Sequence, residues 1–401
     1  MGFARTRLNG VTINNSLKAY SGYTLFTPIG GKQTFLIDME GQVVHRWEMP
    51  HRPGLHAELL PNGNLLYAAR VPEGPLADLT GAGGELLEVD WEGRLVWKYE
   101  DPYLHHTFYR MRNGNTMVIK WVKIPKKLAM KVKGGIPGSE REGVMWTDSF
   151  QEINPNGRVV WEWLSYEHLD PEVDIICPLC PRNEWTGANA CEVLPDSNIL
   201  TSFMKTNTIA IIDKNTGAIK WRWGAGEVGH PHHPTTLNNG NILLLDNGRH
   251  CTGLSIGYSR LLEVNPKTEK MEWNYMGTPW CSFFSSVLGS CQPLPDSYDP
   301  FGPKERSLGN ILVCEGTTGW IFEITRNGEI VWEYVSPFYY DTSHFGQINM
   351  IFRAYRYGPE YEGLKGERAA PSKFRGTVQE KIKTAEEKKT RVHTRLEDLG
   401  Y

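Results

Sequence analysis

Histidines stand at the start of several similar segments, and their placement is the first sign of a functional site in this sequence. Each segment reads as a short strand, a turn containing Asn and Gly, and a second strand. Histidines enter three of these segments at nearly the same place: His56 in HAELLPNGN, His105 and His106 in HHTFYRMRNGN, and His232 and His233 in HHPTTLNNGN. The 401 residues contain only 12 histidines, so chance does not account for this pattern.

Histidine supports two kinds of chemistry at such positions. Its unperturbed pKa of about 6.5 suits a nucleophile or an acid/base group near neutral pH. Three or four neutral imidazoles that converge on one point instead bind zinc, copper, iron or nickel. The predicted ligands of such a metal are His56, His106, His233 and His344, the last at the start of HFGQINMIFRAYRYG.

The elements that must position these histidines repeat six times. A turn followed by an alternating strand with terminal aromatics occurs as GQVVHRW, GRLVWKY, GRVVWEW, GAIKWRW, TEKMEWNY and GEIVWEY. Another strand precedes each copy, so each pair predicts a β-hairpin. The segments with the histidines supply two further strands to each repeat. Six such repeats predict an all-β, six-bladed β-propeller.

The chain ends are expected to close the ring. The sixth inner strand has no outer hairpin after it, while three unmatched strands lie near the N-terminus in YTLFTPIGGKQTFLIDMEGQVVHRW. Pairing of the sixth inner strand with these three N-terminal strands completes the last blade and removes a free sheet edge. We expect the propeller to span residues 1–357, with insertions at about 122–145 and 165–187 that cover one face. A charged tail over 358–401 is expected to be helical.

Innermost strands line the channel of a propeller, so their first residues should converge at one mouth of that channel. Asn189 and Ala190 hold this place in the third repeat and Ser290 in the fifth. Polar groups that converge on a concave surface are the default candidates for an active site. The expected catalytic residues are His56, His106, His232, Asn189 and Arg249. Arg249 is one of five cations near the inner turns that could hold an anion, with Arg70, Arg110, Lys120 and Arg353.

Two further motifs receive structural interpretations. Cys177 and Cys180 form a CxxC, but a structural zinc needs four ligands and no second cysteine pair has a matching spacing; Cys191 is the only nearby thiol. We interpret this pair as packing residues of an insertion. The repeated tryptophans are expected to pack between blades: Trp97, Trp161, Trp221 and Trp332.

Composition narrows the partners and the compartment. A net charge of −3 argues against a nucleic-acid partner, because phosphates require a strongly basic face. The sequence contains no run of about 18 apolar residues, so no membrane span is predicted. Seven cysteines without a framework spacing, and the lack of an apolar leader segment, favour a cytoplasmic location. We expect a small-molecule substrate, and the sequence is compatible with an oligomer.

Several segments together resemble the aryl-sulfate sulfotransferase family: HHTFYRMRNGNTMV, EWTGANACEVLPDSNILTSF, IIDKNTGAIKWRWG, HPHHPTTLNNGNILLLDNG and NMIFRAYRYGPEYEGL. The resemblance covers about residues 50–365. It implies a six-bladed propeller that moves sulfate from one phenol to another through a covalently sulfated histidine, without a nucleotide donor. Neighbouring His, Asn and Arg side chains hold the sulfuryl oxygens in that family.

Carried over by position, the resemblance implies His232 as the nucleophile, His106 as an axial histidine and Asn189 as the family asparagine. The chain departs from the family pattern at Gly187, where a histidine is expected, and at Phe203, where an arginine is expected. Thr107 also stands where Asp is common. Three functions follow: sulfuryl transfer at His232, a metal-dependent lyase, hydratase or oxidoreductase built on the histidine ring, and a non-catalytic binding propeller.

Overall fold

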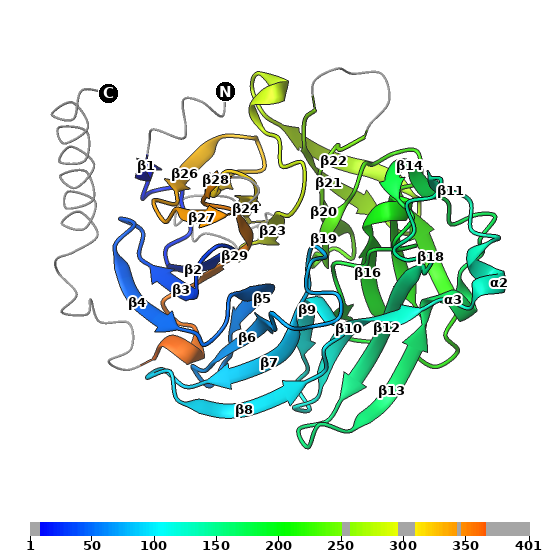
Figure 1. The fold of residues 1–401 in the computed structure, drawn as a ribbon. Coiled ribbons are helices and arrows are strands. Elements are labelled where there is room, and N and C mark those ends of the chain that lie inside the picture. Colours follow the sequence, from blue (N-terminus) through cyan, green and yellow to red (C-terminus); the bar gives the residue numbers. More distant parts are fainter. Residues whose placement is uncertain (1–8, 251–256, 296–308, 343–345, 366–401) are drawn as a thin grey trace, which may run out of the picture.

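The computed structural model describes residues 9–250, 257–295, 309–342 and 346–365. Six sheets surround a central axis, and we call them blades A to F (Figure 1). Blade A contains, from the axis outward, β5 (Pro53–Leu59), β6 (Leu65–Arg70), β7 (Gly84–Val89) and β8 (Leu95–Glu100). Blade B contains β9 (Leu104–Arg110), β10 (Thr116–Lys123), β12 (Trp146–Ile153) and β13 (Val159–Leu164).

The next two blades repeat this antiparallel order. Blade C contains β15 (Glu192–Val193), β16 (Ile199–Phe203), β17 (Thr208–Ile212) and β18 (Ile219–Trp223). Blade D contains β19 (His232–Thr236), β20 (Ile242–Asp246), β21 (Arg260–Asn265) and β22 (Lys270–Met276). Each inner pair is joined by the Asn/Gly or Asp/Ser turn seen in the sequence.

Both chain ends enter the last two blades. Blade F contains β29 (Ile351–Tyr357), β2 (Tyr23–Pro28), β3 (Gln33–Ile37) and β4 (Val43–Glu48), so N-terminal strands pair with the C-terminal inner strand. Blade E contains β23 (Ser290–Pro293), β24 (Ile311–Glu315), β25 (Trp320–Ile324), β26 (Ile330–Val335) and β1 (Gly10–Asn14). The predicted six-bladed propeller closed by both chain ends is confirmed. The fifth strand of blade E, β1, was not predicted.

The blades are held together by apolar side chains between neighbouring sheets. Each adjacent pair of blades encloses one buried cluster; between blades B and C, for example, Phe150 and Trp163 pack against Phe203. Burial of this apolar area is the main favourable term in folding. The ring is therefore stabilised sheet against sheet, which leaves its axis free for polar groups.

Outer-strand tryptophans add a repeated polar contact between blades. The indole N–H of Trp97 donates to the carbonyl of Pro155 at 2.8 Å, and that of Trp332 donates to the carbonyl of Met39 at 2.9 Å. Trp161 makes the same contact with Lys214 at 3.0 Å, and Trp221 packs in the cluster between blades C and D. In each hydrogen-bonded case the acceptor lies in the turn of the next blade.

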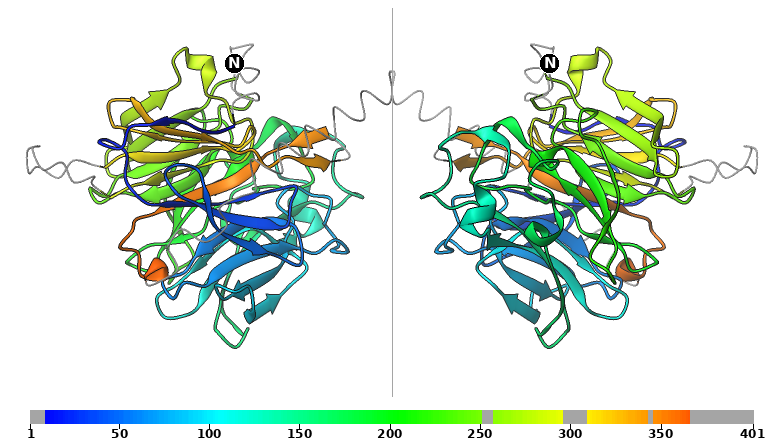
Figure 2. Two further views of the ribbon diagram at one scale, coloured as in Figure 1. Left: turned by 90° about the vertical axis from the view of Figure 1, so that its left-hand side faces the viewer. Right: turned by 90° about the vertical axis from the view of Figure 1, so that its right-hand side faces the viewer.

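The insertions project from one face of the ring (Figure 2). They contain α2 (Lys126–Ala129), β11 (Gly134–Ile136), α3 (Ser165–His168) and β14 (Ile176–Pro181), and β11 pairs with β14 in parallel. A hairpin of β27 (Tyr340–Thr342) and β28 (Gly346–Ile348) projects from the same face. Three short 3₁₀ turns complete the described elements: η1 (Met204–Thr206), η2 (Trp280–Ser282) and η3 (Glu362–Leu364). No helix among the described residues is long and apolar enough to cross a membrane.

Two expectations differ from the structure or fall outside it. The sixth inner strand was expected from His344 onward, but β29 begins at Ile351 after the β27–β28 hairpin. His344 itself lies outside the described residues. The helical tail expected over 358–401 lies outside them beyond Lys365; residues 362–364, before that point, form η3.

Candidate active site along the propeller axis

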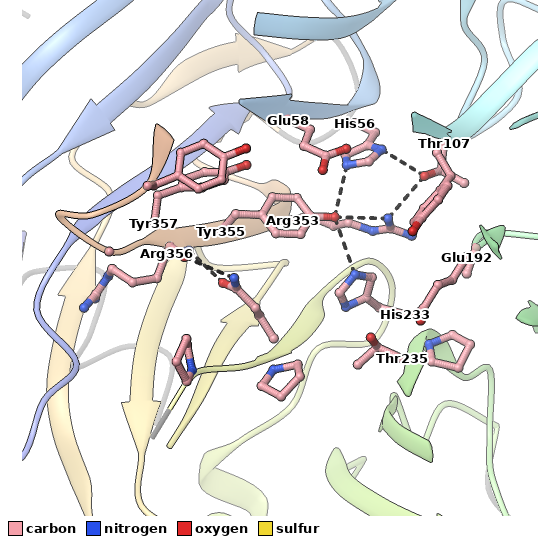
Figure 3. A pocket seen from close by; sticks show the side chains of 18 of the residues that line it. His56, Glu58, Thr107, Glu192, His233, Thr235, Arg353, Tyr355, Arg356 and Tyr357 are labelled. Atoms are coloured by element: carbon pink, nitrogen blue, oxygen red, sulfur yellow. Dashed lines mark hydrogen bonds between the residues drawn. The ribbon is translucent and has the colours of Figure 1, made fainter. Parts of the chain in front are cut away.

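A cavity of about 690 Å³ lies on the axis, and every inner strand contributes to its wall. The contributing residues include His56 of β5, Thr107 of β9, Glu192 of β15, His233 of β19, Gln292 of β23 and Arg353 of β29 (Figure 3). His56 is buried, whereas Pro295 and Glu360 in the same wall are exposed. The cavity therefore opens beside Pro295 and beside Glu360, which lies in the segment that leads to η3. η3 lies on the face of the ring away from the insertions (Figure 2).

Bulges in the inner strands explain how adjacent histidines serve different sites. His106 and His233 have left-handed backbone, with φ of 55° and 48°, and the strand register shifts beside both. A bulge re-aims the side chains around it, so two consecutive residues need not alternate as in a regular strand. His233 consequently lines the cavity, while His232 contacts a separate group of polar side chains.

Arg353 is the cation at the inner end of the cavity. Its Nη2 donates to the backbone carbonyl of Asn189 at 2.7 Å, and its Nη1 donates to the hydroxyls of Thr107 at 3.2 Å and Tyr355 at 3.3 Å. Three blades thus hold this guanidinium, and residue Arg353 is 8% exposed. Its positive charge lowers the pKa of His56, His106, His232 and His233, which places it within electrostatic reach of all four.

Tyr355 joins the two histidines of the cavity (Figure 3). Nδ1 of His233 lies 2.9 Å from the carbonyl oxygen of Cys291 and 3.3 Å from the backbone nitrogen of the same residue. The shorter contact requires the proton on Nδ1, so Nε2 of His233 accepts from the hydroxyl of Tyr355 at 3.4 Å. The oxygen of Tyr355 then accepts from Nε2 of His56 at 3.0 Å. Nδ1 of His56 in turn accepts from Thr107 at 2.9 Å. These contacts form one directed chain across the axis.

Burial sets the protonation states along this chain. It lowers the pKa of His56 and of His233 well below the ordinary value, so both imidazoles are neutral near pH 7. Burial also raises the pKa of Tyr355 to about 12, which keeps its hydroxyl protonated. Two of the three carboxyls in the wall have raised pKa values: burial raises the pKa of Glu58 to about 7 and raises that of Glu192.

A second group of histidines lies beyond Phe352. Nδ1 of His106 lies 2.8 Å from Nδ1 of His105, and Nε2 of His105 lies 3.1 Å from a carboxylate oxygen of the fully buried Asp148. The two atoms lack hydrogen-bond geometry, but the negative charge of Asp148 favours the proton of His105 on Nε2, in which case Nδ1 of His105 accepts from His106. His106 then has its lone pair on Nε2. Burial lowers its pKa well below the ordinary value.

His232 faces the same apolar ring. The ring centroids of His106 and His232 each lie 6.3 Å from that of Phe352. Nδ1 of His232 donates to the side-chain oxygen of Asn247 at 2.7 Å and to the carbonyl of His230 at 3.0 Å. Its Nε2 therefore carries the lone pair. Burial lowers the pKa of His232 to about 4, against the opposing effect of these two acceptors.

The structure brings some of the predicted residues together and separates others. His56 and His233 share the cavity, while His106 and His232 lie beyond Phe352. The backbone carbonyl of Asn189 accepts a hydrogen bond from Arg353, and its side-chain amide donates to the carbonyl of Pro231 at 3.0 Å.

Arg249 lies farther out, with its Nε 3.3 Å from Nε2 of His250. Among the other predicted cations, Arg110 pairs with Glu88 at 3.1 Å and Lys120 pairs with Asp101. Arg70 bonds to a backbone carbonyl. Only Arg353 of the five therefore lines the described cavity.

Two features were missed by sequence reasoning. Asp148 lies in the interior of β12, and Tyr355 lies two residues after Arg353 in β29. No sequence motif marks either residue. Cys177 and Cys180 meet His230 and His250, and within the described part of the chain this is the one group of potential metal ligands that converges. The two histidine ligands lie in the HPHH and RHC segments, far from the CxxC in sequence, and these segments are the available signal for the cluster. A metal on the axial histidines stays a prediction.

Comparison with known proteins agrees with this architecture. A family model described as Arylsulfotransferase (ASST) matches residues 14–231. No curated protein sequence matches the chain. The solved structure of a protein of unknown function from Bacteroides caccae is 14% identical, with a TM-score of 0.50, over 84% of this chain and 100% of that one. A streptogramin B lyase is 12% identical, with a TM-score of 0.44, over 87% of this chain and 96% of its own.

The similarity to the Bacteroides caccae protein concerns the fold alone, because the identity is low. The family match is of another kind, since it is a match of sequence and extends over blades A to C and the N-terminal strands of blade F. It spans more than half of the residues and ends one residue before His232. The chain belongs to the arylsulfotransferase (ASST) family.

Proposed function

We propose that this protein transfers a sulfuryl group between two small phenolic or similar polar molecules, with His232 as the covalent carrier. The observation that carries the proposal is that the buried guanidinium of Arg353 has no carboxylate partner in the described part of the chain. Among the described residues no carboxylate lies within ion-pair distance of it, and its buried Nε has no hydrogen-bond partner. A buried cation whose hydrogen bonds go only to neutral groups lacks a counter-charge, so an anionic ligand would offset the cost of its burial. The charged oxygens of a sulfuryl group suit this position. For transfer to His232 the group must pass Phe352, whose ring lies 4.8 Å from the guanidinium of Arg353 and 6.3 Å from the imidazole of His232.

His232 is arranged to act as a nucleophile. Asn247 and the carbonyl of His230 hold its Nδ1 hydrogen, which leaves the lone pair of Nε2 for the substrate. In the first step a bond forms between this nitrogen and the sulfur of an aryl sulfate, and the bond from sulfur to the phenolic oxygen breaks. The donor phenolate takes up one proton as it leaves, from solvent in the first turnover and from protonated His106 in later turnovers.

His106 is the acid/base group for both steps in this account. Nε2 of His106 accepts the proton of the acceptor phenol as its oxygen attacks the sulfur, and the N–S bond breaks with its electron pair returning to His232. The same proton is available to the leaving phenol of the next cycle. His105 and Asp148 stabilise the positive charge that His106 carries in between. No net proton is released.

Arg353 compensates for the two family groups that the sequence lacks. Gly187 and Phe203 cannot hold sulfuryl oxygens, but the guanidinium of Arg353 is held rigidly from three blades. A pre-oriented donor that faces developing charge is commonly the largest catalytic contribution. Its loss is therefore expected to lower the rate of transfer rather than only the affinity for the donor.

The direct test is phenol-to-phenol exchange with nitrophenyl sulfate as the donor and phenol as the acceptor. We expect release of nitrophenol that depends on the acceptor, and a fall in kcat/KM of at least about 10³-fold in His232→Ala. His51→Ala is the matched control, because His51 lies away from the cavity. Absence of exchange with a panel of aryl sulfates, or full activity in His232→Ala, would reject this function in favour of a metalloenzyme or a binding propeller.

A further inference from the structure

A second group of titratable side chains lies between an insertion and blade D, outside the axial cavity. Cys177 and Cys180 belong to β14, His230 precedes β19, and His250 follows β20. Their potential ligand atoms all lie within 4.8 Å of one another. Both cysteines and His230 are buried, and His250 is half-buried. The four side chains thus come from three segments that are distant in sequence and meet at one point.

The separations match those around a single tetrahedral ion. With Zn–S of about 2.3 Å and Zn–N of about 2.0 Å, a tetrahedron places sulfur and nitrogen ligands ~3.6 Å apart. The sulfur of Cys177 lies 3.4 Å from Nδ1 of His250, and that of Cys180 lies 3.8 Å from the same atom. The sulfur of Cys180 also lies 3.4 Å from Nε2 of His230. Three measured pairs therefore bracket the expected distance.

The backbone is bent to direct both imidazoles at this point. His230 and His250 have φ of 59° and 60°, in the left-handed region that few non-Gly residues adopt, although Asn, Asp and His are enriched there. Such conformations persist where surrounding interactions over-determine them. The backbone N–H of His230 is held by the side-chain oxygen of Asn207 at 2.9 Å. The backbone of His230 is therefore held in this conformation by a protein contact.

We infer that Cys177, Cys180, His230 and His250 bind one structural Zn²⁺ ion. Two thiolates neutralise the charge of the ion, and two imidazoles complete a tetrahedral set of sulfur and nitrogen ligands, which selects zinc over Mg²⁺, Ca²⁺ or Mn²⁺. All four positions are filled by protein, so the site is closed and leaves no position for a substrate. The C-x-x-C spacing is that of a zinc knuckle.

The ion would connect the insertions to the catalytic blade. β14 carries both cysteines and pairs with β11 of the other insertion, so one ion ties both insertions to the segments around β19 and β20. The carbonyl of ligand His230 accepts the Nδ1 hydrogen of His232 at 3.0 Å. The zinc site would therefore also act as a positioning element for His232, a role that rests on the proposed function, whereas metal binding does not.

Zinc content of the untagged protein tests the site. We expect about one zinc per chain by inductively coupled plasma mass spectrometry, and loss of that zinc in the double variant Cys177→Ser/Cys180→Ser. Cys281→Ser is the matched control, because Cys281 lies outside the cluster, and it should keep its zinc. A second measurement does not depend on the folding of variants: Co²⁺ added to the chelated and reduced native protein should give thiolate charge-transfer and tetrahedral d–d absorption.

Several results would overturn the inference: native protein without zinc that also shows no cobalt spectrum, zinc retained in the double variant, or a Cys177–Cys180 disulfide in protein isolated under reducing conditions. The two proposals fail separately. His232→Ala should lose exchange and keep zinc. Exchange in a zinc-free native protein would reject the zinc site alone, and zinc without exchange in the native protein would reject sulfuryl transfer alone.

Discussion

The side-chain oxygen of Asn247 lies 2.7 Å from Nδ1 of His232. The amide nitrogen of the same residue donates to the carbonyls of Ser285 and Leu288, both at 2.7 Å. Because both amide hydrogens are used, the oxygen must face His232, and His232 must donate from Nδ1. One asparagine thus determines the tautomer that leaves Nε2 of His232 free to attack.

Replacement of Asn247 by Ala should therefore reduce catalysis without removing the nucleophile. We expect kcat to fall about 10²-fold or more with a small change in KM, because the imidazole loses the partner that orients it. Steady-state kinetics over donor concentration separates the two constants. Asn239→Ala, at a turn of blade D, is the control. An unchanged kcat in folded Asn247→Ala would contradict the orienting role.

The guanidinium of Arg353 should be needed for its shape as well as its charge. Arg353→Ala is expected to lower kcat/KM about 10²–10³-fold, as for loss of a donor to developing charge. Arg353→Lys should recover only part of this, because an ammonium group cannot reach Asn189, Thr107 and Tyr355 together. Arg326→Ala, whose side chain pairs with Glu263, is the control. Equal activity of the Lys variant and the wild type would show that charge alone suffices.

Tyr355→Phe should destabilise the axis. The hydroxyl accepts from His56 and Arg353 and donates to His233, so its removal leaves a buried N–H of His56 without a partner. Such a loss costs about 1–3 kcal/mol of the free energy of unfolding, measurable by denaturant titration. Tyr340→Phe, which removes only a contact with Gln33, should cost less. Equal stability of the two variants would contradict the directed chain across the axis.

Glu58 should make stability depend on pH in a particular direction. Burial raises its pKa from 4.5 to about 7, although Arg353 and Arg110 oppose the shift. The folded chain therefore keeps a proton that the unfolded chain loses, and the stability from this group is present below about pH 4.5 and lost as pH rises through about 7. Glu58→Gln removes this titration.

We expect the unfolding free energy of Glu58→Gln, relative to that of the wild type, to increase with pH over that window and to level off above about pH 7. Denaturant titrations at several pH values measure the difference. Glu73→Gln, at an exposed position, should differ from the wild type by a constant amount. A constant difference for Glu58→Gln as well would show that the carboxyl titrates normally.

The ring could be predicted from sequence because each blade repeats the same local signals. Turns, alternating strands and terminal aromatics recur six times, and closure by both chain ends follows from counting strands. β1 escaped prediction because its pairing with β26, as at Gly10 opposite Val335, involves residues at opposite ends of the chain. Its own sequence, GVTIN, is too short to show a clear alternation.

The site could be predicted less completely, for two physical reasons. The histidines of each pair diverge because bulges interrupt the strand alternation, so the sequence alone does not separate His232 from His233. The Cys177 and His250 contact joins residues 73 positions apart through an insertion whose course depends on tertiary packing. Arg353 was identified as a cation near the axis, but its lack of a carboxylate partner emerges only from the packed structure.

The most direct test of sulfuryl transfer is peptide mass spectrometry of the protein after brief incubation with nitrophenyl sulfate and no acceptor. The account predicts a mass increase of one sulfuryl group on the peptide that contains His232, removed when phenol is added and absent from His232→Ala. A modified peptide elsewhere in the chain, or turnover without any modified peptide under conditions that trap the intermediate, would contradict it.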